Sequence, residues 1–577
     1  MLFPKDNELR SVKSLDGFWQ FAADKEDVGL TDAWYNGIKS DDIREIAVPA
    51  SWNEQFNDLF NFHGKGWYEK NIIVPNHLSE KAVYLRFGNV AGKATVWVNG
   101  NQVGSHIGTA LPFECEISSF IEFGKNNKIV VLADSTLDPW SLPPAALGAN
   151  EGRVGFFNSY PAVTYDFFPY GGLQRSVYLY ATNKERIEDI VITTEVSNNK
   201  ATVNFKVLLS NTVNGEISVT TNNQTITLPV SSNTASGSIE IDNPRLWDIG
   251  KPELYDLTVT LIKDGKSIDT YTESYGIRTV KVENGKFLLN GKEVFFKGFG
   301  KHEDFFILGK GFSHAVTVKD FYLLNWIGAN SFRTSHYPYD ENIMDYADRH
   351  GILVIDETPF VGLNTRMYRD DILIKAKSVI KELFERDKNH PCVVMWSLAN
   401  EPNIETKEGE NFFAEMAKTA RELDNTRPIT YVAHLEPENN LGYENYDVVC
   451  INKYYGWYIA PGQMYEALGD FEACIERFYD KFKKPMIISE FGTDAIEGMH
   501  CDPPQMFSEE YQSETVRCQY KMMRKKDYVI GAHVWCFADF KAAQTTSRII
   551  LNRKGVFTRE RQPKMVAHTL KKLWSEE

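Results

Sequence analysis

The sequence predicts a multidomain β plus α/β protein, with a jelly-roll-like β-sandwich, an immunoglobulin-like β-sandwich and a (β/α)8, or TIM, barrel. Three observations support this prediction. The chain has 577 residues, and single hydrophobic cores stop growing near about 250–300 residues. Its first half consists of short segments in which apolar and polar residues alternate. Its second half alternates apolar strands with amphipathic helices, which is typical of a parallel barrel.

The first domain is expected over residues 1–182. Residues 82–87 and 94–98 alternate apolar and polar side chains, as strands with one buried face do. The pair Asn99-Gly100 then predicts a tight hairpin turn into residues 101–104. Many short strands separated by turn residues predict a sandwich of jelly-roll type.

The second domain is expected over residues 183–278. Residues 202–207 and 254–259 have the period-two alternation of half-buried strands. A segment of about 95 residues with such strands fits a small immunoglobulin-like sandwich. The cysteine and tryptophan markers of antibody domains are missing, so the strand order stays open.

The third domain is expected over residues 279–577, where the pattern changes to strands followed by helices. Helices are predicted, for example, over residues 371–388 and 411–423. Eight β-then-α units predict a barrel with its active site at the C-terminal ends of the strands. The predicted strands are residues 293–300, 329–334, 352–356, 393–400, 429–433, 448–453, 486–489 and 530–537.

The overall charge and the cysteines limit the partners and the compartment. A net charge of −15 argues against nucleic acid and anionic membranes as partners. The N-terminus has no secretory signal, and no apolar run is long enough to span a bilayer. The seven cysteines are odd in number and contain no CxxC pair, which indicates reduced thiols and no zinc site. We therefore expect a cytoplasmic protein without a metal.

Two glutamates end predicted barrel strands. Glu401 follows the fourth strand and Glu490 follows the seventh. Cleavage of a glycosidic bond needs two such carboxyl groups on one site. A glutamate at a strand end can also cap the next helix, but two at the same end of one barrel, one of them after Asn400, favour catalysis. The pair predicts an enzyme that cleaves sugars.

A basic segment follows the last predicted strand. Residues 548–564 contain Arg548, Arg553, Lys554, Arg559, Arg561 and Lys564 against Glu560 alone, a net charge of 6 − 1 = +5. In an extended loop, residues two apart point to the same side, so Asn552 and Lys554 can reach one carboxylate. These residues favour an acidic sugar as substrate. By themselves they fit a solvated basic loop equally well.

Several motifs resemble those of glycoside hydrolase family 2. They are WSLANEP at 396–402, SEFG at 489–492 and RTSHYP at 333–338. Three more, DFF at 166–168, NKYYGWY at 452–458 and NRKG at 552–555, are similar to the β-glucuronidase branch of that family, especially gut bacterial members with a short active-site loop. The resemblance covers nearly the whole chain.

The resemblance implies roles for individual residues. Glu401 would be the general acid/base and Glu490 the nucleophile of a retaining double displacement. The expected reaction converts terminal β-D-glucuronides, small or oligosaccharide, into D-glucuronate and an alcohol. No metal or organic cofactor is required, and a homodimer or homotetramer is expected. The implied substrate-binding residues are Asn400, Asp166, His302, Asp304, Asn452, Tyr454, Tyr458, Trp535, Arg548, Asn552 and Lys554.

Alternatives and departures from the family pattern remain. A family-2 β-galactosidase or β-mannosidase would use the same acids, and a non-catalytic carbohydrate-binding protein is a further alternative. Cys536 stands where bacterial β-glucuronidases usually carry asparagine. The short stretch 359–370 predicts an open site that accepts large glucuronides. Some gut relatives bind a flavin nucleotide on their surface, and the sequence neither supports nor excludes this ligand here.

Overall fold

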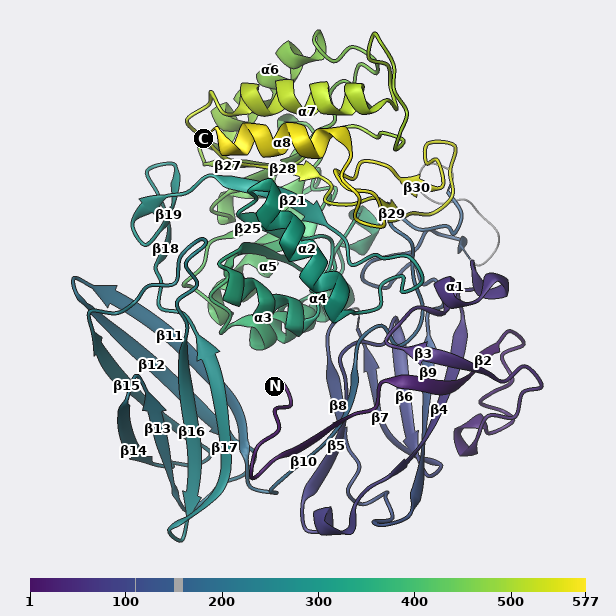
Figure 1. Cartoon of the computed structure of the whole chain (residues 1–577), viewed down its shortest axis with the longest axis vertical. Helices are drawn as coiled ribbons and strands as arrows, with labels where there is room; N and C mark the ends of the chain where they lie inside the picture. Colours follow the sequence, from purple (N-terminus) through teal and green to yellow (C-terminus); the bar gives the residue numbers. More distant parts are fainter. Residues whose placement is uncertain (109, 150–158, 577) are drawn as a thin grey trace.

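The computed structural model describes residues 1–108, 110–149 and 159–576. Two β-sandwiches lie side by side beneath a barrel, the first in purple and blue and the second in blue to teal (Figure 1). The barrel occupies the rest of the chain, in teal to yellow. The predicted architecture of two sandwiches and a barrel is confirmed.

The jelly-roll-like domain packs two antiparallel sheets against each other. Within its described residues the strand orders are β1-β10-β5-β8 and β3-β2-β4-β9-β6-β7, and both sheets contribute to one hydrophobic core. The predicted hairpin joins β6 and β7, with Asn99 and Gly100 at positive φ. Its elements are β1 (Ser11–Ser14), β2 (Gly17–Asp24), β3 (Arg44–Val48), α1 (Trp52–Gln55), β4 (Lys65–Ile73), β5 (Ala82–Phe87), β6 (Lys93–Val98), β7 (Asn101–Ile107), β8 (Phe113–Glu116), β9 (Asn126–Asp134) and β10 (Val177–Thr182).

The immunoglobulin-like domain is a second antiparallel sandwich. Its sheets have the orders β11-β12-β15 and β14-β13-β16-β17. Alternate side chains of both sheets form a separate apolar core, as period-two patterning requires. The strands are β11 (Ile187–Ser197), β12 (Lys200–Leu209), β13 (Glu216–Thr221), β14 (Gln224–Pro229), β15 (Thr234–Asp242), β16 (Tyr255–Lys263) and β17 (Lys266–Tyr275).

A small sheet leads into the closed barrel, and a two-stranded sheet follows it. The predicted barrel strands are confirmed, with ends that differ by at most three residues. The small sheet contains β18 (Val280–Glu283), β19 (Lys286–Leu289) and β20 (Lys292–Glu293), and the final one contains β29 (Phe540–Lys541) and β30 (Leu551–Asn552). The barrel strands are β21 (Phe296–Lys301), β22 (Ser331–Thr334), β23 (Leu353–Glu357), β24 (Val393–Asn400), β25 (Ile429–Ala433), β26 (Val449–Asn452), β27 (Met486–Glu490) and β28 (Val529–Trp535).

Helices follow most of the barrel strands, with one exception. Between β25 and β26, a segment that is described throughout, the chain forms 3-10 turns at Pro437–Asn439 and Tyr443–Asn445. Pro437 and Gly442 in this short connection disfavour a regular helix, so the fifth predicted β-then-α unit lacks its α-helix. The helices are α2 (His314–Ile327), α3 (Glu341–His350), α4 (Asp370–Asp387), α5 (Lys407–Leu423), α6 (Ala467–Phe482), α7 (Glu509–Met523) and α8 (Met565–Ser575).

Buried ion pairs attach the jelly-roll domain to the barrel. Arg559 contacts Glu54 across the two domains at 3.2 Å, and Arg175 contacts Glu303 at 3.0 Å. These contacts place the loop 163–170 of the first domain at the barrel's C-terminal end. Across the described residues, no helix has the length and hydropathy that a bilayer crossing would need.

Candidate active site

A cavity of about 610 Å³ opens at the C-terminal ends of the barrel strands. The jelly-roll loop supplies part of its wall, through Thr164, Tyr165 and Asp166. The cavity therefore belongs to two domains. The residues expected from sequence that line it are Asp166, Asn400, Glu401, Asn452, Tyr454, Tyr458, Glu490, Trp535, Arg548, Asn552 and Lys554.

Glu490 ends β27 and is held by donors on both carboxylate oxygens. Arg333 donates to Oε1, and the Tyr454 hydroxyl donates to Oε2 at 2.5 Å. Burial raises the pKa of the Glu490 carboxyl, while the charge of Arg333 opposes the rise and that of Glu401 adds to it. The carboxylate is thus fixed in place, and the guanidinium of Arg333 favours its ionised form.

Arg333 links Glu490 to a second buried acid, Glu357. Its Nη1 donates to both oxygens of Glu357, at 2.8 and 2.9 Å. Burial by itself would raise the pKa of Glu357, but Arg333 and His336 outweigh it and hold the pKa below its usual range. Neither Arg333 nor Glu357 was predicted as a site residue. Their places at the ends of β22 and β23 are the signal that could have identified them.

Glu401 directly follows β24 and is only half-buried. Its φ of 52° lies in the left-handed region, a conformation that costs a non-glycine residue roughly 1–3 kcal/mol and is concentrated at functional sites. Asn452 donates to Glu401 Oε1 at 2.8 Å. Asn452 is also the register partner of Glu490, so it brings the two acids to neighbouring positions.

The orientation of Asn400 is set by donors on its amide oxygen. Asn452 donates to Oδ1 at 3.2 Å and Arg333 at 3.4 Å. With the oxygen used as an acceptor, the NH2 group is the part of this amide suited to a substrate hydroxyl.

Lys554 lies in the same cavity with its ammonium group fully desolvated. Its Nζ donates to Asp494 at 2.8 Å and to the Tyr458 hydroxyl at 2.9 Å. Lys554 and Asp494 are each 1% exposed. Asp494 was not predicted from the sequence. Asp494 lies four residues after Glu490, and nothing in the sequence links it to Lys554. The contact between them appears only in the folded chain.

Asp166 reaches the same group of charges from the jelly-roll domain. Arg548 donates to both Asp166 oxygens, and Asn552 Nδ2 donates to Oδ2 at 3.1 Å. The two cations, Arg548 and Lys554, are therefore balanced by two acids, Asp166 and Asp494. Each buried cation thus has an acidic partner that offsets part of the cost of its burial.

The rest of the basic segment has structural partners. Arg559 pairs with Asp304, Arg561 with Asp320 and Lys564 with Asp539, and none of the three cations lines the cavity. The segment is thus not a solvated loop. Its first half reaches the cavity, and its second half forms ion pairs within the barrel and, through Arg559, with Glu54 of the jelly-roll domain.

His302 and Asp304 are not among the cavity-lining residues, although the resemblance implied sugar contacts for both. His302 lies behind the wall, where its Nδ1 is 3.0 Å from the Tyr337 hydroxyl. Asp304 accepts from Tyr170 at 2.7 Å and from Arg559 at 2.5 Å. Asp304 is occupied in the packing of the two domains, whereas His302 Nε2 is buried without a hydrogen-bond partner among the described residues.

Trp535 and Cys536 lie at the end of β28, and Cys536 is the residue that departs from the family pattern. Trp535 stacks on His336 with ring centroids 4.9 Å apart. Cys536 is fully buried and its Sγ lies 3.2 Å from the Ala538 carbonyl. The Cys536 backbone N–H donates to the Lys554 carbonyl at 3.1 Å. Its side chain does not line the cavity, and its backbone supports the loop of Lys554.

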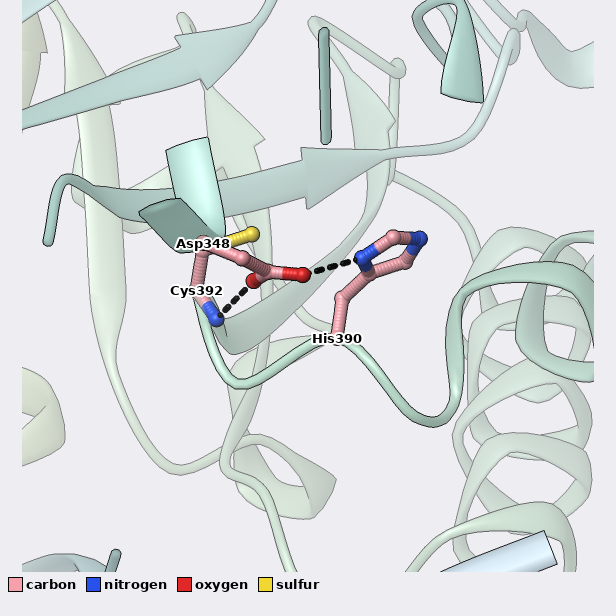
Figure 2. A group of neighbouring side chains, drawn as sticks. All are labelled: Asp348, His390 and Cys392. Carbon is pink, nitrogen blue, oxygen red and sulfur yellow. Dashed lines mark hydrogen bonds and ion pairs between the residues drawn. The ribbon is translucent and has the colours of Figure 1, made fainter. Parts of the chain in front are cut away.

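A cluster of three titratable residues lies at the opposite end of the barrel. Asp348, His390 and Cys392 are residue types that can bind a metal ion. Figure 2 shows Asp348 between His390 and the backbone nitrogen of Cys392. Asp348 binds His390 Nδ1 at 2.6 Å and the Cys392 N–H at 2.8 Å. Although burial opposes it, Asp348 raises the pKa of His390 to about 10, and burial raises that of the Cys392 thiol. Metal ligands must lose these protons, so the geometry fits an ion pair better than a metal centre.

The fold and the paired strand-end carboxylates define the class of a barrel glycoside hydrolase. The family comparisons agree over almost the whole chain. Residues 280–576 match the TIM barrel domain of glycosyl hydrolases family 2, residues 12–183 match its sugar binding domain and residues 185–278 match a further family 2 domain. The chain belongs to glycoside hydrolase family 2.

Relatives and solved structures cover the chain from end to end. A β-glucuronidase of Paenibacillus borealis is 42% identical, over 100% of this chain and 99% of its own. A β-glucuronidase structure from an uncultured Clostridium species has a TM-score of 0.93 and 38% identity, over 100% of both chains. A β-D-glucuronidase structure from Dictyoglomus thermophilum has a TM-score of 0.91 and 40% identity, over 100% of this chain and 99% of that one.

Proposed function

We propose that the protein is a retaining β-glucuronidase that releases D-glucuronate from terminal β-D-glucuronides. One observation carries the proposal: Glu401, Glu490, Asn552 and Lys554 all line the same cavity. The proposal is supported by the names of the relatives and solved structures, which are β-glucuronidases.

The catalytic steps follow from the environments of the two acids. Glu490, fixed by Arg333 and Tyr454, attacks the anomeric carbon as an ionised nucleophile. Glu401, half-buried, donates a proton to the departing oxygen and then takes one from the water that cleaves the glycosyl-enzyme. Asn400 would donate to the sugar 2-hydroxyl, a bond that strengthens as positive charge develops on the ring.

The preference for an acidic sugar comes from the desolvated cations. A glucuronide carboxylate would accept from Asn552 and Lys554, and Arg548 supports them through Asp166. Charge-assisted bonds in a buried site are stronger than neutral ones. A neutral sugar offers no anion to these groups and is bound less well.

The test is a comparison of glycosides in the Lys554→Ala variant. We expect kcat/KM for an aryl β-D-glucuronide to fall by about 100-fold or more, because a buried charge pair is lost. The matching β-D-galactoside, whose activity is low from the start, should change by less than about threefold. Arg553→Ala, in the same segment but outside the cavity lining, is the control. Equal losses on both glycosides would overturn the proposed acid-sugar specificity.

Retention has its own test, in the anomer released first. Proton NMR of an early reaction mixture should show β-D-glucuronate before mutarotation. The α-anomer would mean a single displacement and would remove Glu490 from the nucleophile role.

Two alternatives would show in the same assays. Faster cleavage of a β-galactoside or β-mannoside than of the glucuronide would favour another family 2 specificity. Sugar binding without turnover of any β-glycoside would favour a carbohydrate-binding protein.

We also propose a cytoplasmic homo-oligomer that needs no metal or organic cofactor. All seven cysteines are free thiols, which suits a reducing compartment. The two carboxyl groups and the basic side chains supply acid, nucleophile and binding charge without a further group. A mass from light scattering would test the assembly, and activity retained in chelator would test metal independence.

A further inference from the structure

A second cavity, of about 410 Å³, lies between the jelly-roll domain and helix α4 of the barrel. Tyr165 lines both this cavity and the catalytic one. Of the next two residues, Asp166 lines the catalytic cavity and Phe167 lines the second. The two cavities are therefore separated by a single stretch of chain. Ligand sites commonly measure about 300–1,000 Å³, and this one falls in that range.

Lys310 is the buried cation of this second cavity. It is 8% exposed and lines the cavity, with its Nζ 3.1 Å from the centroid of the Tyr337 ring. Among the described residues, it has neither a side-chain hydrogen bond nor an ion pair. Burial lowers the pKa of the Lys310 ammonium to about 7, with Glu303 opposing the fall. A desolvated cation of this kind gains most from an anion placed beside it.

The other charges at the cavity have partners or face solvent. Asp134 accepts from the backbone N–H of Thr136 at 3.0 Å. Asp138 lies 3.7 Å from Lys93, and Glu382 lies 3.3 Å from His106. Lys375 is exposed on α4. Lys310 is thus the buried cation of the lining that lacks an acidic partner among the described residues, and a small anion bound in the cavity could fill that role.

Aromatic side chains supply the remaining wall. Phe167 and Phe168 are buried in the lining, and Trp140 is 36% exposed at its edge. Flat ring faces of this kind pack against the apolar faces of sugar rings and against other aromatic rings. One desolvated ammonium group and several aromatic rings therefore line the same cavity.

We propose that this cavity is a second ligand site, which binds a carboxylate carried on a ring, with the carboxylate against Lys310 and the ring against Phe167 and Trp140. A sugar acid and an aromatic acid share this chemistry. Their uncharged counterparts lack the group that Lys310 would bind.

The test uses the full chain with the catalytic cavity disabled by Asn552→Ala and Lys554→Ala. Titration calorimetry with D-glucuronate and with benzoate separates the two sources, and D-glucose and benzyl alcohol are the uncharged controls. We expect at least one acid to bind, and to bind about tenfold or more tightly than its uncharged counterpart, because a charge-assisted contact is made. Because this background lacks the proposed uronate-binding groups, the result does not depend on the proposed function.

Variants of the second cavity decide the assignment. Adding Lys310→Met should weaken binding by about tenfold or more, whereas the exposed Lys375→Met should change it by less than about twofold. Lys310→Met removes a buried charge without an acidic partner but also its contact with the Tyr337 ring, so the thermal midpoint should change by no more than a few degrees. Trp140→Ala, at a partly exposed position, should weaken binding independently. Absence of binding by both acids, or unchanged affinity in Lys310→Met and Trp140→Ala, would overturn the proposal.

Discussion

The two ends of the barrel both contain a histidine among buried carboxylates, yet only one end has the geometry of a catalytic site. At the C-terminal end, His336 and Glu490 line the cavity. At the N-terminal end, Asp348 joins His390 to the Cys392 backbone, and none of the three lines any of the cavities described for the molecule. A cluster of charged residues alone therefore does not identify an active site. The charged atoms must also line a cavity that is large enough for a substrate.

The largest expected effect at the catalytic end is that of Glu490→Gln. The amide cannot attack the anomeric carbon, so kcat on an aryl glucuronide should fall by at least about 1,000-fold. The thermal midpoint should stay within a few degrees of the parent value, because the shape of the side chain is kept. Retention of more than about a tenth of the activity would remove Glu490 from its proposed role.

Arg333→Met tests whether the guanidinium keeps the nucleophile ionised. We expect kcat to fall by about 100-fold. Arg333 opposes the rise in the Glu490 pKa, so its loss should raise that pKa further. Activity requires the ionised carboxylate, and the acid limb of the pH profile should therefore move to higher pH.

The matched control is Arg333→Lys, which keeps a positive charge and should restore part of the activity at an acid limb closer to that of the parent enzyme. If the limb of Arg333→Met did not move, the role of Arg333 would be confined to packing.

Asp494→Asn should have a smaller and more selective effect. It leaves Lys554 with the Tyr458 hydroxyl but without its carboxylate partner, so the ammonium group is held less firmly in the position that would bind the sugar carboxylate. We expect KM for the glucuronide to rise by about tenfold with kcat nearly unchanged, and KM for the matching β-D-galactoside to change by less than about twofold. The comparison of the two glycosides separates this effect from a purely structural one. An equal loss of kcat on both glycosides would contradict it.

At the opposite end, Asp348→Asn should affect stability and leave activity intact. Removing one partner of a buried ion pair costs about 3 kcal/mol, measured as the free energy of unfolding in urea. The kcat of the folded enzyme should stay within about twofold, because no atom of this group lines the catalytic cavity. A large loss of kcat at full stability would show that the two ends are coupled.

The last prediction is the pH dependence of that free energy of unfolding. His390 lies among Asp348, Asp345 and Asp387, and its pKa is raised from 6.5 to about 10. A raised pKa adds stability that is complete below the unfolded value and is lost as pH rises through the folded one. The free energy of unfolding should thus fall between about pH 6.5 and 10, less steeply in Asp348→Asn. An identical slope in both proteins would exclude His390 as its source.

The sequence predicted the fold to a large extent because its signals are local. Strand and helix periodicity predicted all eight barrel strands, and the Asn99-Gly100 turn placed a hairpin correctly. The missing helix between β25 and β26 shows the limit of this approach. Its connection is short and contains Pro437, and counting units of a repeating pattern led to a helix that these residues do not form.

The site was predictable only in part, because many of its contacts join distant segments. Glu401 and Glu490 could be found from their places at strand ends, and Asn552 and Lys554 from their spacing. Arg333 lies 157 residues from Glu490, and their strands, β22 and β27, are not neighbours. Their contact therefore depends on the closure and register of the whole barrel, which the sequence alone does not provide. The second cavity forms between two domains, and no run of sequence describes it.

The carboxylate of Asp166 has a consequence for attempts to shorten this protein. It crosses from the jelly-roll domain to contact Arg548 and Asn552. A truncated barrel produced alone would keep both glutamates, but Arg548 would retain Tyr458 and the more distant Asp494 in place of Asp166, and the rim of the cavity would be incomplete. Grafting a foreign N-terminal module onto the barrel would alter substrate choice unless an acid were rebuilt at the same place. The minimal enzyme therefore includes both ends of the polypeptide.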